Sequence, residues 1–133
     1  MNNFYLFLGL FLLVDFLLVV FILYRRSRRK FGPHDLQFFR TEWRKISGHE
    51  DAKHALMDAD KLFHVVMKKK GYQGSVGDQL KKGAKLFSDL NGLWSAHKLR
   101  NKIAHELDVR VSSSERQFAL RSFEKALKDL GAL

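Results

Sequence analysis

The chain has 133 residues, with no cysteine and a single proline, Pro33. The lack of cysteine excludes disulfides and thiol chemistry, and it fits a reducing compartment. Strand-like alternation is also missing, because Val109-Arg110-Val111 is too short to pair. No internal repeat is present. The sequence therefore predicts an all-helical protein, and its length suits one domain with an appendage.

Motifs for three kinds of site are missing as well. Gly74, Gly77 and Gly83 are too scattered for a phosphate-binding loop, and no Lys-Ser or Lys-Thr follows them. The glycines of a nucleophile elbow are absent, so a Ser/His/Asp triad is not predicted. His97 and His105 lie eight positions apart, and no acidic residue completes a cluster with them. We therefore expect neither a metal nor a cofactor.

Residues 4–24 form one long apolar run. As a helix, these 21 residues span about 31 Å, which matches a hydrocarbon core of about 30 Å. Asp15 costs about 2.5–3.5 kcal/mol at mid-membrane, whereas the 17 Leu, Ile, Phe and Val side chains contribute roughly −5 to −10 kcal/mol. The run is therefore predicted to be a transmembrane helix. Asp15 has two interpretations: a protonated acid that pairs across a dimer, or a solitary neutralised carboxyl.

A basic linker, residues 25–33, follows this helix. Its cations are Arg25, Arg26, Arg28, Arg29 and Lys30. Such a cluster keeps its end of the helix in the cytoplasm, so we expect an inner-membrane protein with the N-terminus outside and residues 34–133 in the cytosol. The cluster could also hold anionic lipid, although topology alone explains it. No small-residue cleavage site follows the apolar run, so a signal peptide is not predicted.

Residues 34–133 form the predicted cytosolic domain, which is basic in its own right. The full chain has 24 Lys and Arg against 14 Asp and Glu, a formal charge of +10. Without the five linker cations and Asp15, the domain keeps 19 against 13, or +6. Two interpretations stay open: an acidic partner such as RNA or a lipid surface, and ordinary solubility charge.

Apolar spacing and capping residues predict five helices in this domain. The first carries Leu36–Ile46 after Pro33 and ends at Ser47-Gly48, and the second runs from about His49 to Lys68-Lys69-Lys70 and Gly71. The third follows Ser75 and Asp78 and extends to Phe87, the fourth is capped by Ser88-Asp89, and the fifth follows Ser112 and Glu115. The lysine run is interpreted as a helix cap, with phosphate contact as the alternative.

The fourth helix carries the most unusual stretch of the chain. At 100° per residue, a core stripe is predicted on one side of it, made of Ala96, Leu99, Ile103 and Leu107. A row on the opposite side combines an aromatic, two imidazoles and an amide: Trp94, His97, Asn101 and His105. Arg100 belongs to neither row and is turned roughly 140° from His105.

The string Arg100-Asn101-x-x-Ala104-His105 lies on the penultimate helix of a small predicted bundle. It resembles the signature of the HEPN superfamily, which is an Arg, a polar residue and a His about four to six positions after the Arg. Ala59-Asp60-Lys61-Leu62 followed by Lys70-Gly71-Tyr72 is also similar to small bacterial HEPN-like proteins. The resemblance covers residues 34–133 and implies a dimerising bundle of four or five helices.

In active HEPN members the resemblance implies a metal-independent endoribonuclease site shared across the dimer. Here Arg100, Asn101 and His105 correspond to the Arg, the polar residue and the His of that site. The chemistry agrees, because cleaving RNA through its 2′-hydroxyl needs a proton acceptor, a proton donor and fixed positive charge at the phosphorane. Histidine suits proton transfer near neutral pH, and arginine holds phosphate by parallel hydrogen bonds. The expected RNA-binding or dimer face consists of Trp94, His97, Lys98 and Lys102.

Structural alternatives stay open for these residues. His105 could cap the end of its helix, Arg100 could pair with Asp58 or Asp60, and Trp94 could be interface packing. The sequence thus predicts a membrane-anchored HEPN-like endoribonuclease of a toxin–antitoxin, defence or stress system. The alternative is a non-catalytic membrane-anchored adaptor or dimerisation module. A second copy of the chain, RNA, membrane lipid and a protein partner such as an antitoxin are the expected partners.

Overall fold

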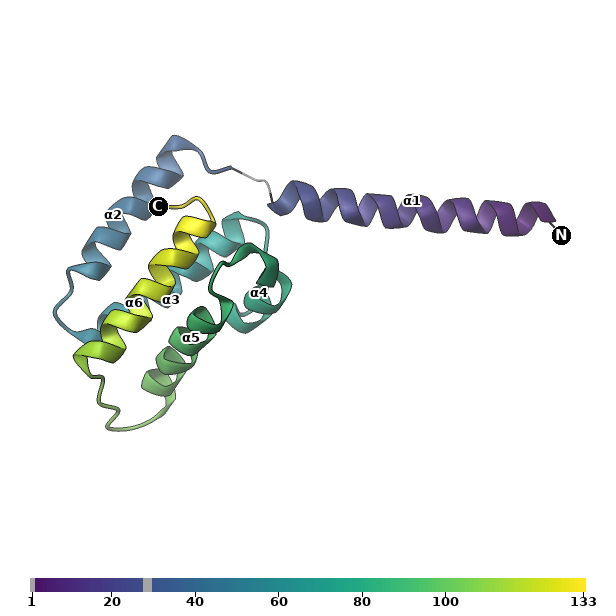
Figure 1. The fold of residues 1–133 in the computed structure, drawn as a ribbon. Helices are drawn as coiled ribbons and strands as arrows, with labels where there is room; N and C mark the ends of the chain where they lie inside the picture. The colour runs from purple at the N-terminus through teal and green to yellow at the C-terminus, as the bar shows by residue number, and fades with distance from the viewer. Residues whose placement is uncertain (1, 28–29) are drawn as a thin grey trace.

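The computed structural model describes residues 2–27 and 30–133, and it is helical in these ranges, with no strand (Figure 1). The helices are α1 (Asn2–Ser27), α2 (Pro33–Ser47), α3 (Ala52–Lys69), α4 (Val76–Lys82), η1 (Ala84–Leu86, a 3₁₀ turn), α5 (Leu90–His105) and α6 (Ser113–Asp129). The predicted all-helical class is confirmed, with one long N-terminal helix followed by a bundle.

Helix α1 carries an almost unbroken series of exposed apolar side chains. Its segment Asn3–Arg25 is long and apolar enough to cross a membrane, and none of that segment is buried inside the protein. Asp15 and Arg25 lie on this helix in exposed positions, and Lys30 is exposed after it. The predicted lipid contacts of Arg28 and Arg29 lie outside the described residues. The structure thus contains the expected helix that is long and apolar enough to cross a membrane.

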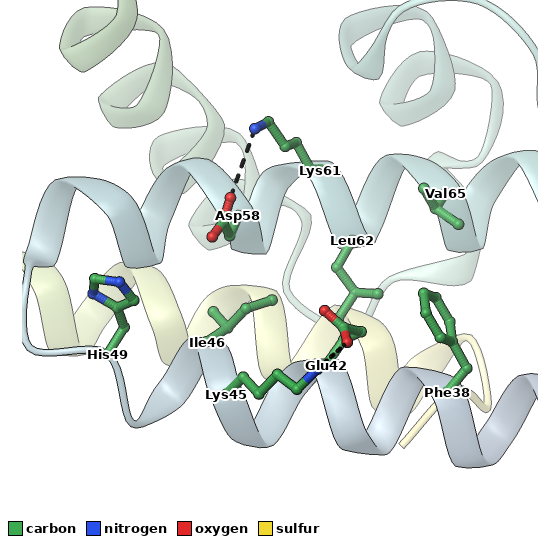
Figure 2. A pocket seen from close by; sticks show the side chains of 9 residues that line it. All are labelled: Phe38, Glu42, Lys45, Ile46, His49, Asp58, Lys61, Leu62 and Val65. Carbon is green, nitrogen blue, oxygen red and sulfur yellow. Dashed lines mark hydrogen bonds and ion pairs between the residues drawn. The ribbon is translucent and has the colours of Figure 1, made fainter.

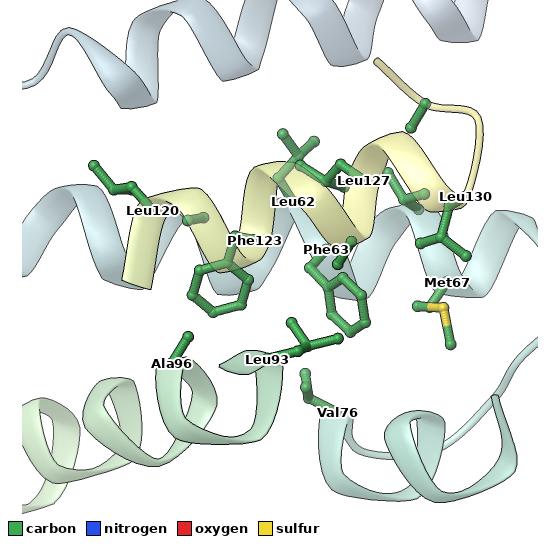
Figure 3. Close-up of a cluster of buried hydrophobic side chains, with 14 of the residues drawn as sticks. Leu62, Phe63, Met67, Val76, Leu93, Ala96, Leu120, Phe123, Leu127 and Leu130 are labelled. Carbon is green, nitrogen blue, oxygen red and sulfur yellow. The ribbon is translucent and has the colours of Figure 1, made fainter. Parts of the chain in front are cut away.

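Helix α3 is central to the bundle, because it packs against α2, α4, α5 and α6. Figure 3 shows Phe63 of α3, Phe123 of α6 and Leu93 of α5 converging in the core. The centroids of the two phenylalanine rings lie 6.3 Å apart at a tilt of 51°. Burying such side chains contributes roughly 1.5–3 kcal/mol each. The last helix turns an apolar face to the core, and the buried residues of that face are Ala119, Leu120, Phe123, Ala126, Leu127 and Leu130.

Capping residues set most helix starts as predicted. Pro33 is at the start of α2, and the Asp89 side chain accepts the N–H of Gly92 at the start of α5. Reciprocal capping boxes join Ser75 to Asp78 and Ser112 to Glu115. The predicted start of the second bundle helix near His49 is wrong by three residues. Asp51 accepts the N–H of Lys53 at 3.0 Å and so places the first turn at Ala52.

The third predicted helix is shorter than expected, since α4 ends at Lys82. Gly83 follows, where a Cβ would come within 2.9 Å of the Met67 methyl carbon and 3.0 Å of the Gln79 carbonyl oxygen. A side chain at this position would therefore crowd the last turn of α4 and the end of the Met67 side chain, and the chain continues through η1. Phe87 still reaches the core, with its ring centroid 5.7 Å from that of Phe63.

Leu107 does not belong to the core stripe, contrary to the prediction. Helix α5 ends at His105, so Leu107 lies beyond the last turn and is 96% exposed. Leu93 and Ala96 are the buried apolar residues of α5, and Leu99 and Ile103 are partly buried against the core. A pattern of helical spacing predicts a shared face only while the helix continues.

The lysine run at the end of α3 divides into different environments. Lys68 is exposed, and Lys69 Nζ lies 2.6 Å from Asp35 Oδ1. Lys70 is buried, donates to the Leu130 carbonyl at 2.9 Å, and has its pKa lowered by that burial. The predicted helix end is confirmed, but the interpretation of the run as a phosphate contact is wrong for Lys70, which water scarcely reaches.

Candidate functional site

Three segments of the bundle border a polar cleft of about 440 Å³. Its lining comes from α3 (Asp60, Lys61, His64), from the start of α4 (Ser75, Val76, Gly77) and from α5 (His97, Arg100, Asn101). With the histidines neutral, one aspartate, one lysine and one arginine leave a formal charge of +1. The cleft therefore favours an anionic ligand over a cationic one.

Helical spacing brings these side chains to one place. Asp60 and His64 are one turn apart on α3, and His97 and Asn101 are one turn apart on α5, so each pair shares a helix face. Because α3 and α5 pack directly against each other, the two faces meet. Phe63 of α3 and Leu93 of α5 belong to the apolar core between these helices, and their packing keeps the two faces together.

Four side chains of the cleft form a closed ring of contacts. His97 Nδ1 lies 2.8 Å from Asp60 Oδ1, and Asn101 Nδ2 lies 3.2 Å from His97 Nε2. Arg100 Nη1 donates to Asn101 Oδ1 at 3.1 Å, and its Nε lies 3.1 Å from Asp60 Oδ2. This last contact is an ion pair without a hydrogen bond, because the Nε–H is not aligned with the oxygen.

Asp60 is the buried centre of the ring, with 3% of its surface exposed. A carboxylate so far from water is costly unless it is paired. Here it accepts the N–H of His97 and faces the positive charge of Arg100. The predicted pairing of Arg100 with an aspartate of α3 is confirmed, and Asp60 is the partner.

Asp58, the other aspartate considered for Arg100, lies elsewhere. It borders a separate cleft of about 320 Å³ that is lined by residues of α2 and α3 (Figure 2). There its Oδ1 lies 3.7 Å from Lys61 Nζ, and about half of its side chain is exposed. Two positions along a helix turn the side chain by about 200°, which explains why Asp58 and Asp60 face different neighbours.

The ring also decides which nitrogen of His97 carries the proton. A carboxylate only accepts, so Nδ1 donates to Asp60. The Asn101 oxygen accepts from Arg100, which turns the Asn101 amide nitrogen toward His97 Nε2. Nε2 must then accept, and the network assigns His97 as a neutral imidazole protonated on Nδ1.

Arg100 keeps part of its guanidinium free for a ligand. Its side chain is 23% exposed. Nη2 has no hydrogen-bond partner within the described ranges and is not among their buried polar atoms without one, so it contacts solvent. A guanidinium held on two sides and open on a third can donate to a phosphate oxygen with little ordering cost.

His105, the other residue of the Arg/His motif, does not line the cleft. It is the last residue of α5, it is exposed, and its ring makes no hydrogen bond, ion pair or ring contact with another described residue. It follows Asn101 by one turn and so continues the row of His97 and Asn101 past the end of the cleft. A position in the last turn also suits the alternative of a helix-end cap, and the two roles are compatible.

The members of the row opposite the predicted core stripe differ in exposure: His105 is exposed, Trp94 and Asn101 are partly buried, and His97 is buried. His97 is 8% exposed because it faces Asp60. Trp94 is half-buried, with its ring centroid 6.1 Å from that of His97, and a Cβ on Gly77 would lie 3.9 Å from the Trp94 ring. Lys98 and Lys102 are exposed on α5, as contact with RNA or a partner requires.

Sequence reasoning missed His64, the second histidine of the cleft. Apolar spacing describes the inward face of α3 well, but it gives no reason to single out a polar residue beside that face. The available signal was the one-turn spacing from Asp60, a residue of the HEPN-like string. In the described part of the chain, no group of three or more His, Cys, Asp or Glu could hold a metal ion.

The cleft and the motif residues lie on neighbouring parts of α3, α4 and α5. Asp60, His97, Arg100 and Asn101 are brought together, whereas His105, Lys98 and Lys102 lie on the surface of the same helix. Comparisons with protein-family models, curated proteins and solved structures find no match for this chain.

Proposed function

We propose that this protein is a membrane-anchored, HEPN-like endoribonuclease whose helical domain acts on RNA in the cytosol. The observation that carries the proposal is the state of Arg100. Asp60 and Asn101 position its guanidinium, while Nη2 stays open to solvent in a cleft of net positive charge. Fixed positive charge of this kind stabilises the phosphorane that forms when a 2′-hydroxyl attacks a neighbouring phosphate.

The exposed His105 supports the same proposal. Its ring makes no hydrogen bond or ion pair with another described residue, so it is free to donate or accept a proton. It lies on the cleft-lining side of α5, one turn beyond Asn101. In this proposal Arg100 and Asn101 hold the phosphate, and His105 transfers a proton during cleavage.

A dimer completes the proposed site. Because His105 lies past the end of the cleft, the imidazole of a second copy can approach Arg100 when two α5 helices meet near their C-terminal ends. Crossing the membrane through α1 confines both copies to a plane and raises their effective concentration. Arg25 and Lys30, with the other linker cations, favour an orientation that places this site in the cytoplasm.

The experiment is cleavage of single-stranded RNA by the full-length protein in lipid nanodiscs, with chelator present. Cleavage should yield a 2′,3′-cyclic phosphate and a 5′-hydroxyl. His105→Ala should lower kcat/KM by about 10²–10⁴-fold without lowering the melting temperature. His34→Ala is the matched control, since His34 is also exposed and has no contact within the described ranges. Absence of wild-type cleavage would overturn the proposal.

Sharing across the dimer has its own test. Arg100→Lys keeps a positive charge beside Asp60 but loses the fork of donors, so it should be inactive and still folded. Mixed with His105→Ala, it can form a heterodimer in which one site contains an intact Arg100 and an intact His105. Recovery of activity on mixing supports a shared site, and two inactive variants that stay inactive together refute it.

The second candidate function is a non-catalytic membrane-anchored adaptor. The observation in its favour is that the ring around Asp60 satisfies most of its own polar groups, as a purely structural network does. An adaptor predicts no RNA cleavage, and it predicts loss of a dimer or partner in Trp94→Ala with the helical content retained.

A further inference from the structure

His64 is held in the cleft by a fully buried glutamine. Its Nδ1 lies 3.0 Å from Gln79 Oε1, and Gln79 has 0% of its surface exposed. The two residues come from α3 and α4, so this contact joins two walls of the cleft. A buried amide that meets an imidazole at this distance constrains the proton positions on the ring.

The orientation of Gln79 is determined by its other contacts. Its amide nitrogen donates to the Tyr72 carbonyl at 3.0 Å and lies 3.4 Å from the carbonyl of His64 itself. The amide oxygen is therefore the atom that faces the imidazole, and it can only accept. His64 must carry a proton on Nδ1, which leaves the lone pair of the neutral ring on Nε2.

The Nε2 atom of His64 is available to a ligand. It makes no hydrogen bond to any described residue, and it is not among their buried polar atoms without a partner, so solvent reaches it. His64 also lines the cleft that contains Arg100. His64 and Arg100 of one chain thus line the same cleft, and each has a side-chain nitrogen without a hydrogen-bond partner among the described residues.

The two histidines of the cleft differ in what protonation does to them. A proton added to His97 Nε2 would face the Asn101 amide hydrogens, and turning Asn101 around would break its bond from Arg100. A proton added to His64 Nε2 leaves the Nδ1–H···Oε1 bond to Gln79 intact. Of these two rings, His64 is the one whose printed hydrogen bond stays intact when Nε2 carries a proton.

We propose that His64 is the general base of the RNA-cleaving site, a catalytic residue that the Arg/His motif does not include. This inference rests on the proposed endoribonuclease function. Cleavage needs two proton transfers, and His105 supplies one of them. Nε2 of His64 takes the proton from the 2′-hydroxyl, O2′ bonds to phosphorus, and the P–O5′ bond breaks. Protonated His105 gives its proton to the departing O5′, while Arg100 binds the phosphorane.

The products are a 2′,3′-cyclic phosphate and a 5′-hydroxyl, and no water, oxidant or metal enters this balance. The proton gained by His64 and the proton lost by His105 are exchanged with solvent afterwards. The charged and titratable groups that line the cleft with His64 are Asp60 and Lys61 on α3, together with His97 and Arg100 on α5, and Lys68 follows His64 by one turn on α3. The residues of α4 that line the cleft are not titratable.

The test compares RNA cleavage by wild type, His64→Gln and His64→Ala in nanodiscs. Glutamine can still donate to Gln79 Oε1 but cannot take the proton, so His64→Gln should fold normally. We expect kcat to fall by about 10²–10⁴-fold with KM changed little. The rising limb of the pH–rate profile should disappear, and added imidazole should restore part of the activity of His64→Ala. His34→Gln, as the matched control, should change none of these.

The outcomes separate the two proposals. If wild type cleaves RNA and His105→Ala does not, but His64→Ala stays within about twofold of wild type, the base assignment fails and the endoribonuclease stands. Loss of activity that imidazole does not restore, with the rising limb kept in His64→Gln, would reduce His64 to a structural role and also overturn the assignment. If wild type itself cleaves no RNA, both proposals fall.

Discussion

The Nδ1 atom of His97 donates to the buried carboxylate of Asp60 across 2.8 Å, although the two residues are 37 positions apart in the chain. The contact ties α5 to the central helix α3 through a polar pair inside a mainly apolar interface. Arg100 joins it at 3.1 Å and brings the guanidinium to the cleft. The residue that positions the arginine of the motif is therefore also a residue that holds the bundle together.

Removing Asp60 should destabilise the protein strongly. Asp60→Ala leaves the His97 N–H and much of the Arg100 charge without a partner, so we expect a loss of about 3 kcal/mol in the free energy of unfolding. This loss is at the low end of the range for breaking a buried ion pair, because Arg100 keeps some contact with water. Urea unfolding in micelles, followed by the fluorescence of Trp94 and Trp43, measures it.

Asp58→Ala is the matched control for Asp60→Ala, since Asp58 lies two positions away on the same helix. Its exposed pair with Lys61 spans 3.7 Å, so the loss should be within about 0.5 kcal/mol. Equal losses in the two variants would show that the ring around Asp60 adds nothing to stability.

Leu93 of α5 and Leu107, which lies just beyond its end, should respond very differently to truncation. Leu93 is buried in the core beside Phe63 and Phe123, so Leu93→Ala should cost about 2–5 kcal/mol. Leu107 is 96% exposed after the end of α5, and Leu107→Ala should change stability by less than about 0.5 kcal/mol. Thermal or urea unfolding of both variants measures the difference, and a large loss for Leu107→Ala would mean that it has a buried partner.

The capping box at the start of α6 should make stability depend on pH. The backbone N–H of Ser112, and then its hydroxyl, hold the pKa of the Glu115 carboxyl below its usual value. A carboxyl with a lowered pKa in the folded state adds stability above its unfolded pKa and loses it as the pH falls through the folded one. The free energy of unfolding should therefore decrease as the pH falls below the usual glutamate value of 4.5 and through the lower pKa of the folded state.

Glu115→Gln isolates this contribution, because glutamine still offers an oxygen to Ser112 but does not titrate. The variant should show a shallower decrease with acid than wild type. Ser112→Ala should cost about 1 kcal/mol at neutral pH, as expected for an N-cap. An identical acid dependence in wild type and Glu115→Gln would rule out the box as its source.

The orientation of the proposed membrane helix can be measured with fusions. A reporter that works only in the cytoplasm should be active after Leu133, because a basic cluster such as the one that begins at Arg25 favours the cytoplasmic side of a membrane. Replacing all five cations by glutamine should reduce this preference. A periplasmic reporter that is active after Leu133 in the unchanged chain would overturn the orientation and the access to RNA together.

Local signals determined much of this structure. Apolar spacing and the caps at Asp89, Ser112 and Pro33 place helices correctly, because these interactions act within one or two turns. The apolar run before Arg25 is readable for the same reason. The ends of two helices were harder to predict: α4 ends before Gly83, where a side chain would crowd Gln79 and Met67, and α5 ends before Leu107, so that Leu107 lies outside the core.

The motif Arg100-Asn101-x-x-Ala104-His105 was visible in the chain, and the candidate pairing of Arg100 with Asp60 was among the alternatives that the chain offered. Which aspartate faces α5 was decided by packing, because two positions on α3 point about 160° apart. The burial of His97 and the place of His64 were decided in the same way. Donor and acceptor matching between side chains that are distant in sequence arises only when α3, α4 and α5 meet, and that matching determines which ring nitrogens of His64 and His97 face a partner.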